Sequence, residues 1–351
     1  MALSKQKRQV IIDSLISDIG KDTFSNGFSV DDFSVSHGLT KQSIYRYLSS
    51  LEAETIISKQ KEGRKNKYRL IDTSFHFNYP LPNLSEESVW KKEVRPILQG
   101  IADITMSICD YVFNEMLNNA IDHSEGSEVD ISVFINAYSV TFMIKDDGVG
   151  IFSKIAAAMQ FDEKRYAVLE LAKGKFTTDP KKHSGEGIFF SAKAADSFAI
   201  FSDEILFSSW NLKEIEQPDD LPVSLPSALH CGTVVCFVVF RDNATPISEV
   251  FDRYTQAPDD YGFTKTLVPV RLLEHGDQKP TFVSRSQAKR LLARFERFEC
   301  IELDFTNIED IGQGFADEVF RVFRNEHPNS KIVAINCNQR VEQMINHVTR
   351  R

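Results

Sequence analysis

The sequence predicts a multi-domain α+β protein, and two observations support this fold class. The first is its length, because 351 residues correspond to two or three domains of roughly 100–200 residues each. The second is the apolar pattern, which changes from helices with a polar hairpin, through mixed strands and helices, to regular strand–helix alternation. No apolar run approaches the roughly 20 residues that span a bilayer, and the N-terminus has no secretory hydrophobic region. We therefore expect a cytoplasmic protein without membrane contact.

Charge is distributed unevenly along the chain. Residues 1–70 contain 12 Lys+Arg and 8 Asp+Glu, whereas the remainder contains 29 and 42, and the net charge is −9. This split indicates that any nucleic acid is bound by the N-terminal region. The five cysteines are scattered and form no CxxC pair, which argues against a zinc site and a disulfide framework.

Residues 1–72 predict three helices followed by two short strands. The helices are expected at 5–19, 30–36 and 40–51, and the strands at 55–59 and 67–71. Thr40 is the expected N-cap of the third helix, whose buried stripe would be Ile44, Leu48 and Leu51. This order of elements is that of a winged helix-turn-helix.

Two sets of residues in this region are candidates for DNA contact. The third helix would enter the major groove, and the hairpin, with six Lys+Arg and one acidic residue across 59–69, would contact phosphate. The candidates are Lys41, Gln42, Ser43 and Arg46 on the helix, and Arg64, Lys65 and Lys67 on the hairpin. The region resembles winged helix-turn-helix transcription factors, which implies double-stranded DNA as a partner. A use in dimerisation or protein contact is the alternative.

The remaining chain divides at two polar segments that contain prolines. The prediction is a linker at 73–97 with a short helix near 86–93, a domain at 98–243 with strands at 129–135 and 139–145, a second linker at 244–263, and a final domain at 264–351. In the final domain we expect strands at 266–271, 300–305 and 331–335 and helices at 284–298, 313–324 and 341–348.

A carboxylate and an amide share one face of the helix expected at 98–124. Glu115 and Asn119 are four residues apart, so their side chains are neighbours. An amide oxygen is a hard ligand for Mg²⁺, and a carboxylate can orient or deprotonate a nucleophile. This pair suits a magnesium–phosphate site, and a pair of ordinary surface residues is the alternative.

Two further motifs lie at strand ends. Asp146 closes a strand and is followed by Gly148 and Gly150. Such a carboxylate can accept a hydrogen bond from an adenine amino group, and the glycines let the backbone approach the ring. Gly232 and Thr233 precede a late strand. The Asp146 motif alone is also explained by a tight turn.

A glycine pair opens a helix in the same region. Gly185 and Gly187 come directly before and at the start of an expected helix at 187–195, where free backbone N–H groups bind anions. The segment before them is rich in lysine and is predicted to be a mobile lid over phosphates, and a solvated loop is the alternative. Its lysines are Lys173, Lys175, Lys181 and Lys182.

In their order and spacing, these motifs resemble the ATP-binding domain of the gyrase, heat-shock chaperone, histidine kinase and mismatch-repair (GHKL) superfamily. The resemblance covers about 98–240 and implies a Bergerat-type α/β sandwich of helices on a mixed sheet. It also implies that Asp146 and Thr233 contact adenine, that Asn119 holds Mg²⁺, and that Glu115 acts as a base. The nucleotide-binding residues would be Asn119, Asp146, Gly148, Gly150, Gly185, Gly187 and Thr233.

The sequence differs from the sensor histidine kinases of this superfamily in two features. Sensor histidine kinases usually have a further glycine where Phe189 stands, and no phospho-acceptor histidine helix precedes the first motif here. The stretch from Glu115 to His123 resembles more closely the anti-sigma-factor serine kinases.

The final domain resembles the STAS-like domains that often follow such ATPase domains in bacteria. The matching stretches are 284–288, 303–305 and 312–318, and Ser284 with Gln287 predicts a capping box. Anti-sigma-factor antagonists carry a phosphorylatable serine in the loop at 310–314, which here has no hydroxyl. A binding role toward a protein partner is therefore expected.

The sequence leads to three functional hypotheses. The first is a DNA-binding transcriptional regulator in which Mg-ATP switches the contacts between domains. The second is an anti-sigma-type serine/threonine protein kinase, and the third an ATPase with Glu115 activating water. Whether ATP is hydrolysed, transferred or only sensed stays open, as does a homodimer.

Overall fold

The computed structural model describes residues 5–22, 28–62, 65–176, 185–210, 232–255, 262–273 and 282–350. The chain forms two compact units, each assembled from two stretches of sequence. The first combines Met1–Val149 with Ala195–Ala244, and the second combines Gly150–Ala194 with Thr245–Arg351. Across these described ranges, no helix has the length and apolar character needed to traverse a bilayer.

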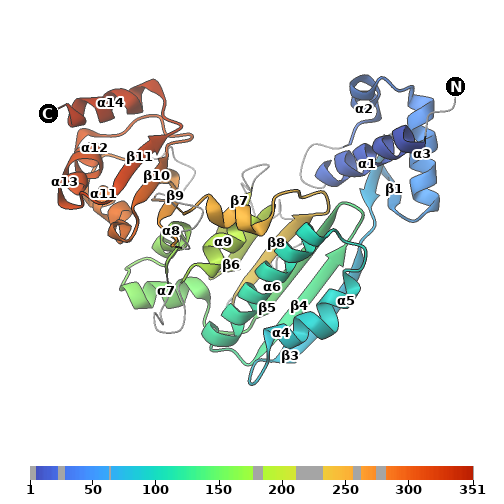
Figure 1. The fold of residues 1–351 in the computed structure, drawn as a ribbon, viewed down its shortest axis with the longest axis horizontal. Helices are drawn as coiled ribbons and strands as arrows, with labels where there is room; N and C mark the ends of the chain where they lie inside the picture. The colour runs from blue at the N-terminus through green and yellow to red at the C-terminus, as the bar shows by residue number, and fades with distance from the viewer. Residues whose placement is uncertain are drawn as a thin grey trace. The chain divides into compact units, whose positions relative to one another are not determined.

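The first unit begins with three helices and an antiparallel hairpin, the order predicted from the sequence (Figure 1). These elements are α1 (Lys5–Asp22), α2 (Val30–His37), α3 (Lys41–Ala53), β1 (Ile57–Glu62) and β2 (Lys65–Leu70). Thr40 caps α3 by accepting a hydrogen bond from the Ser43 N–H, and Ile44, Leu48 and Leu51 are buried. Both predictions for this helix are confirmed.

A six-stranded sheet forms the centre of the first unit, in the order β3-β4-β5-β8-β6-β7. Its strands are β3 (Thr73–Pro80), β4 (Glu128–Ile135), β5 (Ser139–Asp146), β6 (Ser197–Ser202), β7 (Ile205–Trp210) and β8 (Val234–Phe240). Every neighbouring pair is antiparallel. The expected mixed sheet is therefore wrong for this chain, because β8 runs antiparallel to both β5 and β6.

Strand β3 occupies part of the predicted linker at 73–97. Alternate residues of this strand differ in burial, and Phe75, Phe77 and Tyr79 share its more buried face. Pro80 is tolerated because it is the last residue of an edge strand, where a missing N–H breaks no ladder. The expected short helix near 86–93 is present as α4 (Glu86–Val89), the π-turn η1 (Trp90–Val94) and α5 (Arg95–Ile97).

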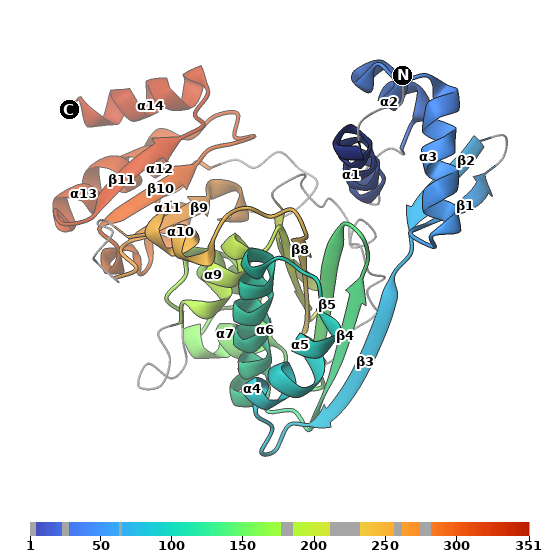
Figure 2. The same cartoon turned by 45° about the vertical axis from the view of Figure 1, so that its right-hand side comes forward.

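Helix α6 (Asp103–His123) packs along one face of β5 and β8, as Figure 2 shows. Its Phe113 ring lies 5.8 Å from Phe142 of β5, which stacks on Phe237 of β8 at 4.6 Å. All three rings are fully buried. Because these rings come from helix and sheet alike, this aromatic stack joins the two layers.

The N-terminal region also packs on the sheet. Ile16 of α1 and Leu70 of β2 contact a buried cluster of Tyr138, Val238 and Phe240. Strand β2 ends only two residues before β3 begins. The hairpin and the sheet edge are therefore almost continuous in the chain.

The second unit contains a three-stranded parallel sheet in the order β11-β10-β9. Its strands are β9 (Lys265–Pro269), β10 (Cys300–Asp304) and β11 (Lys331–Ile335). Its helices are α7 (Ile151–Met159), α8 (Tyr166–Lys173), α9 (Gly187–Ala194), α10 (Ile247–Asp252), η3 (Val270–Leu273), α11 (Arg285–Leu292), η4 (Phe295–Arg297), α12 (Gln313–Asp317), η5 (Glu318–Val322), α13 (Phe323–Glu326) and α14 (Gln339–Thr349). Helix α10 lies inside the second predicted linker.

Two helices of this unit test predicted boundaries. The capping box of Ser284 and Gln287 is present at the start of α11 and is confirmed. The helix expected at 284–298 ends at Leu292, because Ala293 is extended and Arg294 is left-handed, with φ +67°. The helix expected at 313–324 is present but contains a π-turn, η5.

Candidate functional site

The carboxyl group of Asp146 is the central polar group at the end of β5. Its residue is 6% exposed, and Oδ1 accepts hydrogen bonds from the N–H of Gly148 at 2.9 Å and of Thr233 at 3.2 Å. Burial raises the pKa of Asp146, and the two backbone donors oppose this change. A fixed, desolvated carboxylate of this kind is a strong acceptor for an incoming N–H donor.

The turn after Asp146 lies directly against the end of α6. The Val149 N–H donates to the carbonyl oxygen of Ser124, the C-cap of α6, at 2.9 Å. A Cβ at Gly148 would overlap this Ser124 carbonyl, so only glycine fits here. The backbone contact therefore brings the helix with Glu115 and Asn119 to the Asp146 turn.

Gly232 lies just before β8 and completes this site. We call the site formed by Asp146, Gly148, Gly232 and Thr233 the Asp146 corner. The φ of Gly232 is +86°, and a Cβ there would overlap the carbonyl oxygen of Asp146. The buried hydroxyl of Ser202 donates to the Gly232 carbonyl at 2.8 Å. The first unit thus brings together Asp146, Gly148 and Thr233, three of the residues predicted to bind nucleotide.

Sequence reasoning missed the residues that support this corner. Asp147 Oδ1 accepts from the N–H of Ser127 at 2.7 Å and of Glu128 at 3.1 Å, and Oδ2 accepts from the Ser127 hydroxyl. These bonds lower the pKa of Asp147. The available signal was its position next to Asp146 in the sequence.

On α6, Asn119 is half-buried, and its Nδ2 atom is buried without a hydrogen-bond partner in the described structure. An unsatisfied buried polar atom costs about 1–3 kcal/mol, so the side chain is suited to a ligand that supplies a partner. Glu115 is half-buried on the same helix.

Asn119 is the residue that we expect from the sequence to hold Mg²⁺. Among the described residues, no group of three or more His, Cys, Asp or Glu side chains could hold a metal ion. Magnesium bound with a nucleotide keeps several waters and takes further ligands from the phosphates, so it needs few ligands from the protein. Asn119 would supply one of them through its amide oxygen.

The remaining predicted nucleotide residues belong to the second unit. Gly150 is the N-cap of α7 with φ +83°, and Gly187 is the first residue of α9. Gly185 has φ +75°, and a Cβ there would overlap the backbone of Phe176. Gly150 and Gly185 thus meet a backbone requirement within the second unit.

The two described lysines of the predicted lid contact protein groups in the structure. Lys173 is 1% exposed and ion-paired with Glu170, so it is wrong as a lysine that faces phosphate. Lys175 donates to the Arg297 carbonyl at 3.2 Å. Lys181 and Lys182 lie outside the described residues.

The predicted DNA contacts fall into three groups. On α3, Lys41, Gln42 and Arg46 are exposed, and Lys41 forms an ion pair with Asp31. Ser43 is half-buried, and its hydroxyl lies 3.0 Å from that of the N-cap Thr40. On the hairpin, Lys67 is half-buried in β2, Lys65 is the first residue of β2, and Arg64 is outside the described residues.

A hollow of about 430 Å³ lies on the sheet face opposite α6. His76, Asp130, Ser132 and Lys145 line it together with apolar residues. None of the residues predicted to bind nucleotide lines this hollow.

In the second unit, three parallel strands with flanking helices define an α/β domain at its C-terminal end. Residues 287–342 match the family model of a STAS-like domain of unknown function (DUF4325). The chain therefore carries a STAS-like domain at its C-terminus. The match includes β10 and β11 but neither β9 nor α8. No curated protein matches the chain.

Proposed function

We propose that this protein is a DNA-binding regulator that binds Mg-ATP, and that the nucleotide switches the contacts of its domains. The observation that carries this proposal is the Asp146 corner. A buried carboxylate is fixed there by the N–H groups of Gly148 and Thr233, against the end of the helix that bears Asn119. This arrangement suits recognition of an adenine amino group beside a magnesium-bound phosphate chain.

Each residue has a distinct role in the proposed site. Asp146 would accept a hydrogen bond from adenine, and Thr233 would support it from β8. Asn119 would hold Mg²⁺, and Glu115 would activate a nucleophile if ATP is consumed. Gly185 and Gly187 would offer N–H groups to phosphate at the start of α9.

The DNA-binding part of the proposal rests on α3. Its apolar stripe is buried, and Lys41, Gln42 and Arg46 point away from that core. A helix with one buried face and a polar, partly basic outer face suits the major groove. A protein partner of the STAS-like domain completes the proposal.

Removal of the Asp146 carboxyl group is expected to lower ATP affinity by about 10- to 100-fold, because a charge-assisted hydrogen bond contributes roughly 1.5–3 kcal/mol. Equilibrium binding of Mg-ATP is measured for the wild type and for Asp146→Ala. Asp130→Ala is the control, since Asp130 is exposed on β4 and its carboxyl group accepts a hydrogen bond from the Asn78 amide at 2.8 Å. Equal affinity in all three proteins would refute the nucleotide site.

The same binding mixtures, with ATP labelled at the γ-phosphate, distinguish the candidate activities. Label in free phosphate identifies an ATPase, label in protein identifies a kinase, and label retained in bound ATP identifies a nucleotide sensor. Glu115→Ala is expected to keep ATP binding and to abolish either form of turnover.

Arg46→Ala is expected to weaken binding to double-stranded DNA by about 10-fold at fixed salt, since it removes a cation from the exposed face of α3. Fluorescence anisotropy with pooled duplexes measures this affinity with and without Mg-ATP. Glu54→Ala, at the C-cap of α3, is the control. The switch is refuted if Mg-ATP changes neither DNA affinity nor oligomeric state.

A further inference from the structure

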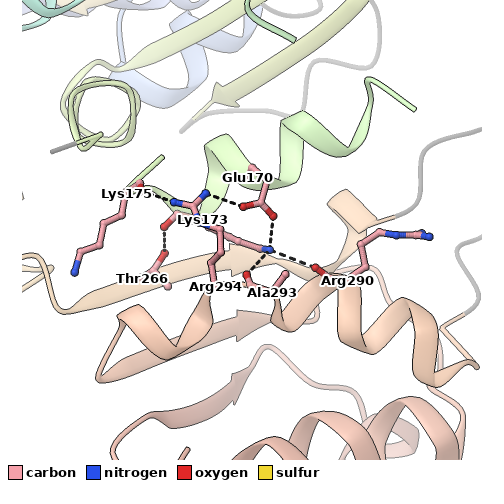
Figure 3. A network of polar contacts seen from close by, with 7 residues as sticks. All are labelled: Glu170, Lys173, Lys175, Thr266, Arg290, Ala293 and Arg294. Carbon is pink, nitrogen blue, oxygen red and sulfur yellow. Dashed lines mark hydrogen bonds and ion pairs between the residues drawn. The ribbon is translucent and has the colours of Figure 1, made fainter. Parts of the chain in front are cut away.

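The second unit contains a buried charge network that the proposed ATP site does not use. Glu170 and Lys173 of α8 are each 1% exposed, and Lys173 Nζ donates to Glu170 Oε1 at 2.6 Å. Arg294, just after α11, donates to Glu170 Oε2 at 3.0 Å. Figure 3 shows these side chains between α8 and the end of α11. One carboxylate thus binds two cations from segments about 120 residues apart.

Lys173 also satisfies the end of α11. Its ammonium donates to the carbonyls of Ala293 at 2.9 Å and Arg290 at 3.3 Å. The last carbonyls of a helix have no partner within it, and a cation there is favoured by the helix dipole. Burial lowers the pKa of Lys173 and Glu170 opposes this. Three acceptors match the three N–H donors of an ammonium group, so the geometry favours the charged form.

The segment after α8 is held by the same partners. The buried hydroxyl of Thr266 in β9 donates to the Lys173 carbonyl at 2.8 Å. Arg294 donates to the Lys175 carbonyl, and its guanidinium lies 5.1 Å from the centre of the Phe176 ring. The C-terminal ends of α8 and α11 therefore satisfy each other's backbone.

These contacts continue to the predicted phosphate-binding glycines. The backbone of Phe176 is so close to Gly185 that no Cβ fits between them. A continuous series of contacts therefore runs from Gly185 through Phe176 and Arg294 to α11. Residues of α11 lie within the matched STAS-like region.

We propose that α8 is an integral part of the STAS-like domain, and that Glu170, Lys173 and Arg294 transmit nucleotide binding to its first helix, α11. The transmission rests on the proposed ATP site. The contacts that join α8 to α11 do not depend on the proposed ATP site. Since removing one partner of a buried ion pair is strongly destabilising, the two helix ends are expected to open together.

The test is hydrogen exchange in the full chain, read from peptides that cover α11. Lys173→Met keeps the length of the side chain but removes its charge. We expect exchange in α11 to be faster by about 100-fold or more, and protection by Mg-ATP to be lost while ATP still binds. Lys289→Met is the control, because Lys289 lies on α11 itself with a side chain 71% exposed. It should match the wild type.

Three results would overturn parts of this inference separately. If the α11 amides of Lys173→Met exchange at the wild-type rate, the proposal that α8 and α11 form one structural unit is refuted. Continued protection of α11 by Mg-ATP in that variant would refute the transmission. Absence of ATP binding to the wild type would refute the proposed site and leave the first comparison valid.

A second measurement uses the wild type and therefore tests the proposal even if the Lys173→Met variant does not fold. Native-state exchange of the wild type in increasing denaturant gives the opening free energy of each helix. The amides of α8 and α11 should share one value, and two distinct values would refute the joining.

Discussion

Gly232→Ala is expected to abolish the nucleotide site, with ATP affinity lowered by about 100-fold or more. The new methyl group would overlap the carbonyl oxygen of Asp146, which is backbone and cannot rotate away. The start of β8 must then move from the end of β5. This breaks the bonds between Asp146 and Thr233, in which each residue donates its N–H to the other.

Gly38→Ala is the matched control for this substitution. Gly38 also has a positive φ, +61°, but nothing lies within 4 Å of the position that its Cβ would take. Gly38→Ala should therefore introduce only about 1–2 kcal/mol of conformational strain and leave the ATP affinity unchanged. Equal affinities of the two variants for Mg-ATP, measured by titration calorimetry, would show that the Asp146 corner does not bind the nucleotide.

Phe142→Ala is expected to lower the free energy of unfolding of the first unit by about 3–5 kcal/mol. The ring is fully buried between Phe113 of α6 and Phe237 of β8, so its removal leaves a cavity between helix and sheet. Denaturant unfolding followed by circular dichroism measures the loss.

Phe134→Ala provides the comparison for Phe142→Ala. Phe134 is half-buried on the opposite face of the sheet, where its ring meets His76 edge-on at 5.8 Å. This substitution is expected to lower the free energy of unfolding by about 1 kcal/mol, because a half-buried ring loses fewer contacts. Similar losses for the two variants would contradict the assignment of the core to the α6 face.

Local signals predicted most elements of this fold. Thr40 and Ser284 mark helix starts through side-chain caps that depend only on residues three positions away, and both caps are present. Strands β4, β5, β10 and β11 lie within one or two residues of their expected bounds, because their apolar runs are short and sharply ended. The turn of Asp146 and Gly148 is a local signal, because the two residues are two positions apart, whereas Gly232 and Thr233 were linked to it only through the family resemblance.

What the sequence did not predict depends on distant partners. Strand β3 falls in the predicted linker because Pro80, Pro82 and Pro96 of that segment outweigh its alternating aromatic residues, and its partner β4 lies about 50 residues later. Lys173 was expected to face phosphate, since no local pattern shows that Arg294 and the carbonyls of α11 surround it. The early end of α11 has the same cause, because Lys173 satisfies its last carbonyls from another segment.

The interleaving of the two units has a consequence for synthesis on the ribosome. Strand β8 lies between β5 and β6, yet it is made about 90 residues after β5. At roughly 5–20 residues per second, the open edge of β5 waits roughly 5–20 s for its neighbour. During this interval β5 can pair with β4 on one side only, and its other edge, which is to receive β8, is open. An open edge of an apolar strand is a template for wrong pairing. Translation speed between residues 146 and 234 is therefore expected to influence the yield of folded protein.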